Sequence, residues 1–237
     1  MTTNHLILLP GLMSDAQVWA EQASALSGLT HCEVPDYGLC DSLAGMAQQV
    51  LAGTSAATFA LAGHSMGGRV ALEVLRQAPG RVQRLALLDT GIYPLAAGEA
   101  GDKERAGRLA LVELAQQQGM RVMGAQWVRA MVHPDVLGTA LLERILDMLA
   151  RSSPAQFAAQ INALLNRPDA APLLSSIKCP TLVLTGREDL WSTPEQHASI
   201  ASAIGGAQLC IVEHCGHLST LEQPAAVSAA MAQWLQS

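Results

Sequence analysis

A serine lies between glycines at the point where an apolar run gives way to a helical pattern. The stretch ALAGHSMGGRVALEVL covers residues 60–75, and its centre is G-H-S-M-G, with the serine at position 65. The spacing G-x-S-x-G is typical of a sharp strand-to-helix turn that exposes a serine hydroxyl. Glycines are needed there because side chains beside so tight a turn would collide with the strand or the helix. The stretch therefore predicts a strand-turn-helix unit with Ser65 as a nucleophile.

Short apolar runs followed by turn residues recur along the chain and are typical of buried parallel strands. They are His5–Leu9, His31–Val34, Thr58–Ala62, Arg84–Leu88, Thr181–Thr185 and Leu209–Glu213. Helical patterns lie between them, for example over residues 44–52 and 67–76. This alternation predicts an α/β fold of about six mostly parallel strands flanked by helices.

Capping residues mark three expected helix starts. Ser14 and Gln17 form a capping box ahead of the first helix. Thr193 and Ser153 are each followed by a proline, which is favoured at the first helical position.

No strand pattern is found from about residue 93 to residue 178. The stretch DVLGTALLERILDMLA predicts one amphipathic helix with an apolar face of Val136, Leu137, Leu141, Leu142, Ile145, Leu146 and Leu149. A helical block inserted after the fourth strand is the expected form of a lid, and the alternative is an extra layer that only adds stability. We expect an α/β core of residues 1–93 and 179–237 and a helical cap of residues 94–178.

Composition excludes several classes of protein. The net charge is −6 and the chain has no cluster of Lys and Arg, so a nucleic-acid partner is not expected. The first apolar run is too short for a signal peptide or a membrane span. Five cysteines without a secretory signal indicate reduced thiols, so we expect a cytoplasmic protein.

An acid and a base follow the last two predicted strands. Glu188 and Asp189 come after residues 181–185, and His214 and His217 come after residues 209–213. A serine nucleophile needs a base, and that base needs an orienting acid. The chain order of Ser65, an acid and a histidine, each beyond a strand's carboxyl end, predicts one shared site at that edge of the sheet.

The chain resembles the α/β-hydrolase superfamily over nearly its whole length. The segments that carry the resemblance are LLPGLMSDAQVW, ALAGHSMGGRVALEVL, PTLVLTGREDLWSTPE and VEHCGHLSTLEQP, in the family's order. The resemblance implies that Ser65 is the nucleophile, Asp189 the acid and His217 the base. It also implies that the first run corresponds to the family's third strand, which leaves a six-stranded version of the fold.

The resemblance further implies an oxyanion hole made of two backbone N–H groups. They map to Met66, directly after the nucleophile, and to Leu12 in the loop after the first strand. This chain has Pro10-Gly11 where many relatives have His-Gly. Since the donor belongs to the backbone, the hole is still expected.

Rival assignments exist for the base and the acid. His214 is an alternative base, but Gly216-His217 fits the family's loop pattern. Asp89 is an alternative acid because some relatives carry theirs after that strand, whereas Glu188 is expected to be a solvated neighbour. The E-H-C-G-H stretch lacks a second pair of ligands elsewhere, so no metal site is expected.

Aromatic residues near the site are candidates for a substrate pocket. Trp191, Tyr93 and Trp127 can either contact substrate or simply pack. The cap methionines at helical spacing are more typical of a core than of a pocket; they are Met120, Met123, Met131 and Met148.

These features predict a serine hydrolase that cleaves a carboxylic ester of a small, largely apolar molecule without a cofactor. A thioesterase, an enol-lactone hydrolase or a carbon–carbon bond hydrolase would use the same triad, and fold alone does not separate them. A ligand-sensing signalling member and a purely structural α/β domain are the alternatives outside catalysis. The cap helices can also serve as a dimer face, so a homodimer stays open.

Overall fold

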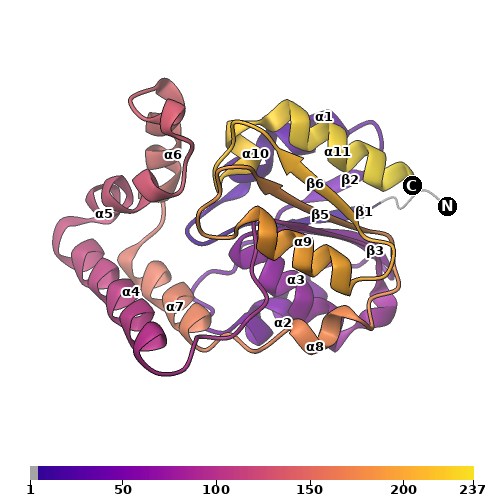
Figure 1. Cartoon of the computed structure of the whole chain (residues 1–237), viewed down its shortest axis with the longest axis horizontal. Coiled ribbons are helices and arrows are strands. Elements are labelled where there is room, and N and C mark those ends of the chain that lie inside the picture. Colours follow the sequence, from indigo (N-terminus) through magenta and orange to yellow (C-terminus); the bar gives the residue numbers. More distant parts are fainter. Residues whose placement is uncertain (1–4) are drawn as a thin grey trace.

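The computed structural model describes residues 5–237, which form one six-stranded sheet with helices around it (Figure 1). The strand order is β2-β1-β3-β4-β5-β6, and every neighbouring pair is parallel. The strands are β1 (His5–Leu9), β2 (His31–Glu33), β3 (Phe59–His64), β4 (Val82–Leu88), β5 (Thr181–Gly186) and β6 (Gln208–Val212). The predicted α/β fold of about six parallel strands is confirmed.

The registers of these strands bring their carboxyl ends to one edge of the sheet. Leu9 of β1 pairs with Gly63 of β3, and His64 pairs with Leu88 of β4. β3 and β5 are buried along their whole length, as expected for strands covered on both faces. The loops that leave β1, β3, β4, β5 and β6 at this edge therefore lie close together.

Helices cover both faces of the sheet. Figure 1 shows α1 (Ala20–Leu26) and α11 (Pro224–Gln236) on one face, where they pack together, and α2 (Leu43–Gly53) with α3 (Met66–Gln77) on the other. α9 (Pro194–Ala203) contacts β5 and β6, and the short α10 (Ser219–Glu222) precedes α11.

The elements between β4 and β5 are all helical. They are α4 (Glu99–Gln118), α5 (Met120–Trp127), α6 (Ala140–Ala150), α7 (Pro154–Leu165) and the short α8 (Ala171–Leu174), with 3₁₀ turns at Val128–Ala130 and Pro134–Val136. In Figure 1, α4 to α7 stand away from the helices that cover the sheet, whereas α8 lies with the core elements. α4 packs on α5 and α7, and α5 packs on α6.

Of the three predicted helix starts, two are confirmed and one is wrong. Thr193 and Ser153 each cap a helix, accepting from the N–H three residues on. The first helical turn is capped by Asp15 and not by Ser14, because the Asp15 carboxylate accepts from Gln17 N at 2.9 Å and the turn is 3₁₀.

The amphipathic helix predicted over residues 135–150 is shorter than expected. α6 begins at Ala140, because Gly138 has a positive φ of 77° that interrupts helical geometry. Val136 belongs to a separate 3₁₀ turn, and Leu137 is exposed. Within residues 5–237, no helix is both long and apolar enough to cross a bilayer.

Candidate active site

Ser65 lies at the turn between β3 and α3 in a strained backbone conformation. Its φ of 54° and ψ of −116° are rarely adopted by a residue with a side chain. A Cβ on Gly63 would lie 2.3 Å from Gly67 O, and a Cβ on Gly67 would lie 2.2 Å from Leu9 O. Only glycine fits at either position, which is the steric reason that the sequence pattern predicts. The turn leaves the Ser65 side chain at the N-terminus of α3.

His217 lies in the loop between β6 and α10, and hydrogen bonds hold this loop on both sides of the ring. The Glu222 carboxylate accepts from Gly216 N at 3.0 Å and from Leu218 N at 2.9 Å. His217 N donates to Met131 O, a carbonyl of the segment between β4 and β5, at 2.6 Å. These bonds fix the backbone of the histidine from both directions.

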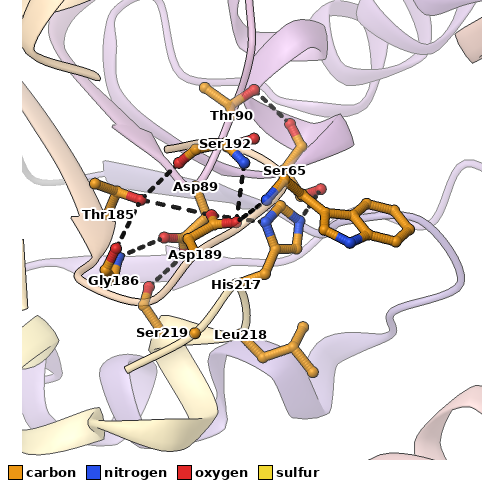
Figure 2. Close-up of polar contacts among 12 residues, drawn as sticks. Ser65, Asp89, Thr90, Thr185, Gly186, Asp189, Ser192, His217, Leu218 and Ser219 are labelled. Carbon is orange, nitrogen blue, oxygen red and sulfur yellow. Dashed lines mark hydrogen bonds and ion pairs between the residues drawn. The ribbon is translucent and has the colours of Figure 1, made fainter. Parts of the chain in front are cut away.

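The structure brings Ser65, His217 and Asp189 into one hydrogen-bonded line (Figure 2). His217 Nε2 lies 2.8 Å from Ser65 Oγ, and His217 Nδ1 lies 2.8 Å from Asp189 Oδ2. The other Asp189 oxygen accepts from Trp191 N at 2.8 Å and from Ser192 N at 2.9 Å. In this arrangement the carboxylate orients the ring with its remaining nitrogen toward the serine hydroxyl.

The charges of this line are set by burial and by mutual attraction. Burial alone would raise the pKa of Asp189, but the His217 ring and the two backbone donors outweigh it and hold that pKa below its ordinary value. Burial alone would lower the pKa of His217, but Asp189 outweighs it and raises that pKa above 6.5. The pair therefore favours an ionised Asp189 and a more basic His217.

Asp89, the rival acid, is buried beside this line but does not touch the His217 ring. It accepts from Gly186 N at 3.2 Å and from the Ser219 hydroxyl (Figure 2). Burial and the charge of Asp189 raise the pKa of Asp89 well above its ordinary value. The geometry favours Asp189 as the residue that orients the ring.

The other rivals lie elsewhere. The His214 ring packs edge-to-face on His133, with centroids 6.0 Å apart. Glu188, expected to be solvated, instead accepts from Cys215 N at 2.8 Å and so helps to hold the histidine loop. Among residues 5–237, no group of three His, Cys, Asp or Glu side chains is arranged to hold a metal ion.

Two backbone N–H groups near Ser65 have no acceptor within the described chain. The N–H groups of Leu12 and Met66 make no hydrogen bond among residues 5–237, whereas the next one, Met13 N, donates to Gln160 Oε1 at 2.8 Å. Leu12, Met66 and Ser65 all line the same cavity. These donors are free to meet an oxygen of a bound molecule.

A cavity of about 750 Å³ opens beside Ser65 and His217, between the sheet's carboxyl edge and the helices α4, α5 and α7. All three aromatic candidates line it. Trp127 is buried and meets the half-exposed Trp191 at 5.5 Å between ring centroids, and Tyr93 is 57% exposed. The methionines of the segment between β4 and β5 are buried and do not line this cavity, which agrees with their interpretation as core residues: Met120, Met123, Met131 and Met148.

The sequence interpretation missed a set of charged residues in the cavity wall. They are Arg69, Lys103, Glu104, Arg108 and Arg167. Arg69 had a usable signal, because it lies four residues after Ser65 and so about one helical turn further along the same face. The others come from α4 and from the segment after α7, and nothing in their sequence spacing shows that they converge.

The sequence matches the alpha/beta hydrolase family over residues 6–230. The chain belongs to this family. Its relatives include "(E)-2-((N-methylformamido)methylene)succinate hydrolase" of Acinetobacter baylyi, which is 26% identical over 98% of this chain and 90% of the relative. They also include "2-succinyl-6-hydroxy-2,4-cyclohexadiene-1-carboxylate synthase" of Klebsiella pneumoniae, which is 26% identical over 98% and 94%. A thermophilic esterase from Thermogutta terrifontis superposes with a TM-score of 0.87 at 25% identity, over 99% of this chain and 90% of the esterase.

Proposed function

We propose that this family member is a serine hydrolase that cleaves a carboxylic ester of a small, largely apolar molecule, with Ser65, His217 and Asp189 as its catalytic triad. The observation that carries the proposal is the pair of 2.8 Å contacts that His217 makes, one to the hydroxyl of a strained serine and one to a buried carboxylate. The structural similarity to an esterase supports an ester as the substrate.

In the proposed reaction, the Ser65 oxygen attacks the acyl carbon while its proton passes to His217 Nε2. The bond from the acyl carbon to the alcohol oxygen then breaks, and His217 returns the proton to the departing alcohol. Water repeats the cycle on the acyl-serine, giving the free acid and restoring the hydroxyl. The steps use no cofactor.

The N–H groups of Leu12 and Met66 would stabilise the negative charge on the acyl oxygen during both attacks. Their lack of partners within the described chain supports this role, and Met66 N also lies at the positive end of α3. Loss of one such donor typically lowers kcat by about 10²–10³.

We also propose that residues 94–178 act as a cap over an α/β core of residues 1–93 and 179–237. The cap supplies Trp127 to the cavity, and the core supplies Tyr93 and Trp191 as further substrate contacts. Such a cap would exclude water from the cavity, and the exclusion of water strengthens the electrostatic interactions of the triad.

The test is hydrolysis of 4-nitrophenyl esters from acetyl to long acyl chains by the wild type and by Ser65→Ala. Turnover by the wild type that disappears in a folded Ser65→Ala variant supports the triad, and the preferred chain length reports the size of the cavity. Equal turnover by both proteins would contradict the assignment of Ser65.

A further inference from the structure

One part of the cavity wall is positively charged. Arg69 of α3 and Arg108 of α4 line it together with Arg167, from the segment that follows α7, and Lys103 stands on the same helix as Arg108. Glu104 is the acid among them. The other acid of the cavity wall, Asp89, is engaged with Ser219 and Gly186 beside the triad. This part of the wall therefore has three guanidinium groups and one carboxylate, Glu104.

Glu104 already forms ion pairs with two of these arginines. Arg167 binds it through both terminal nitrogens, at 2.8 and 2.9 Å, and Arg108 Nε donates to it at 2.9 Å. Burial would raise the pKa of Glu104, but these two arginines outweigh burial and lower that pKa, so the group is ionised. Its single negative charge is shared between two cations.

Arg69 has no such partner. Its Nη1 donates to Tyr93 O at 2.9 Å, and no carboxylate among residues 5–237 lies within ion-pair distance of it. Burial, followed by the charges of Arg167 and Arg108, lowers the pKa of Arg69 to about 9, which still leaves it charged at neutral pH. Arg69 is partly buried, and a partly buried cation without an ion-pair partner among residues 5–237 is stabilised when an anion from outside the chain binds to it.

We propose that Arg69, with Arg108 beside it, binds a carboxylate of the substrate at a distance from the bond that is cleaved. This inference rests on the proposed function. With a carboxylate at the far end of its acyl chain, the ester substrate is a monoester of a dicarboxylic acid. The Arg69 guanidinium and the terminal nitrogens of Arg108 keep free donors, and a guanidinium matches a carboxylate in shape and charge.

The geometry of α3 fits this substrate. Ser65 and Arg69 are four residues apart, so their backbones differ by about 6 Å along the helix axis, and both side chains line the cavity. A short acyl chain can therefore place its ester carbonyl at Ser65 and its far carboxylate at the guanidinium. Apolar side chains of the same cavity suit the methylene groups between the two ends; they are Leu111, Ile161 and Leu164.

The experiment compares two esters that differ only at the far end. Mono-4-nitrophenyl adipate carries the free carboxylate, and methyl 4-nitrophenyl adipate carries it capped. The ratio of their kcat/KM values at neutral pH and low salt is expected to favour the charged ester by about tenfold or more in the wild type, as for a charge-assisted hydrogen bond. Arg69→Gln should reduce this ratio by about tenfold or more, and Arg69→Lys should retain part of it.

The matched control is Arg105→Gln, which removes the same charge from an exposed position of α4 that does not line the cavity. It should leave the ratio unchanged. A wild-type ratio near one, or an equal loss in the Arg105→Gln and Arg69→Gln variants, would overturn the carboxylate site while the esterase assignment stands.

A binding measurement separates failure of this inference from failure of the proposed function. Calorimetry with adipate on Ser65→Ala should show binding that Arg69→Gln abolishes. That result without hydrolysis of either ester would support the carboxylate site and contradict the esterase. Binding of inorganic phosphate in place of adipate would overturn the carboxylate assignment in favour of a phosphate group.

Discussion

At the scale of single residues, two buried aspartates lie near His217 and have opposite protonation tendencies. Asp189 bonds to the ring and to two backbone donors, which hold its pKa down. Asp89 is fully buried next to that negative charge, which raises its pKa. The first environment favours a carboxylate that can stabilise a positively charged imidazole, and the second favours a neutral acid.

Replacement of each aspartate by asparagine should separate their roles. Asp189→Asn should lower kcat by about 10³–10⁴, because the asparagine amide no longer fixes the ring's tautomer or its charge. Asp89→Asn should lower kcat by less than about tenfold, because a neutral side chain can still accept a hydrogen bond from Gly186 N. Steady-state rates of the two folded variants on one ester make the comparison. The reverse ranking would move the catalytic acid to Asp89.

The pH dependence of the reaction should follow the raised pKa of His217. Only the neutral ring can take the Ser65 proton, so kcat/KM should be low at acidic pH and rise through a midpoint above 6.5. Asp189→Asn removes the charge that raises this pKa, so the midpoint should fall. A pH profile of both proteins measures the shift, and a wild-type midpoint below 6.5 would contradict the influence assigned to Asp189.

At the scale of elements, the sequence predicts the site where local chemistry and sheet topology agree. Buried parallel strands have a clear apolar signature, and residues directly beyond their carboxyl ends must meet at one edge. This reasoning brings Ser65, Asp189 and His217 together although they are far apart along the chain. In the structure all three lie in one hydrogen-bonded line.

Contacts that depend on how helices pack could not be predicted in this way. Arg108 and Arg167 converge with Arg69 only because α4 and α7 pack together above the sheet. The Glu222 carboxylate accepts hydrogen bonds from three backbone N–H groups in two loops, and no sequence pattern indicates this; the donors are His133, Gly216 and Leu218. The first helix cap lies one residue from its predicted position because both Ser14 and Asp15 are good capping residues.

The turn between β3 and α3 should tolerate no side chain at Gly67. Gly67→Ala would force a Cβ to within 2.2 Å of Leu9 O, so the backbone must move, and the cost should be about 1–3 kcal/mol or more. Gly53→Ala is the control, because Gly53 ends α2 with open space around it and alanine favours a helix. Urea unfolding of both variants measures the difference. A Gly67→Ala variant as stable as the wild type would contradict this geometry.

At the scale of the whole molecule, the helical segment between β4 and β5 helps to build both halves of the site. Gln160 of α7 accepts from Met13 N and so fixes the loop that carries Leu12. The carbonyl of Met131 accepts from His217 N and fixes the histidine loop. A movement of this segment away from the core would break both bonds at once. The position of this segment and the geometry at Leu12 and His217 are therefore coupled.

Gln160→Met should test this coupling, because methionine fills a similar space but leaves the buried Met13 N without its acceptor. Loss of this hydrogen bond should lower the free energy of unfolding by about 1–3 kcal/mol. Because the adjoining Leu12 N–H would be less well positioned, kcat should fall by about tenfold, with a smaller effect on KM. Gln156→Met is the matched control one turn earlier on α7, since the Gln156 side chain accepts from the Ser152 hydroxyl, within the cap itself. Steady-state kinetics with thermal unfolding separate the two effects. If the folded Gln160→Met and Gln156→Met variants have the same kcat, the contact between Gln160 and Met13 does not contribute to the reaction. The α/β core alone would then position Leu12.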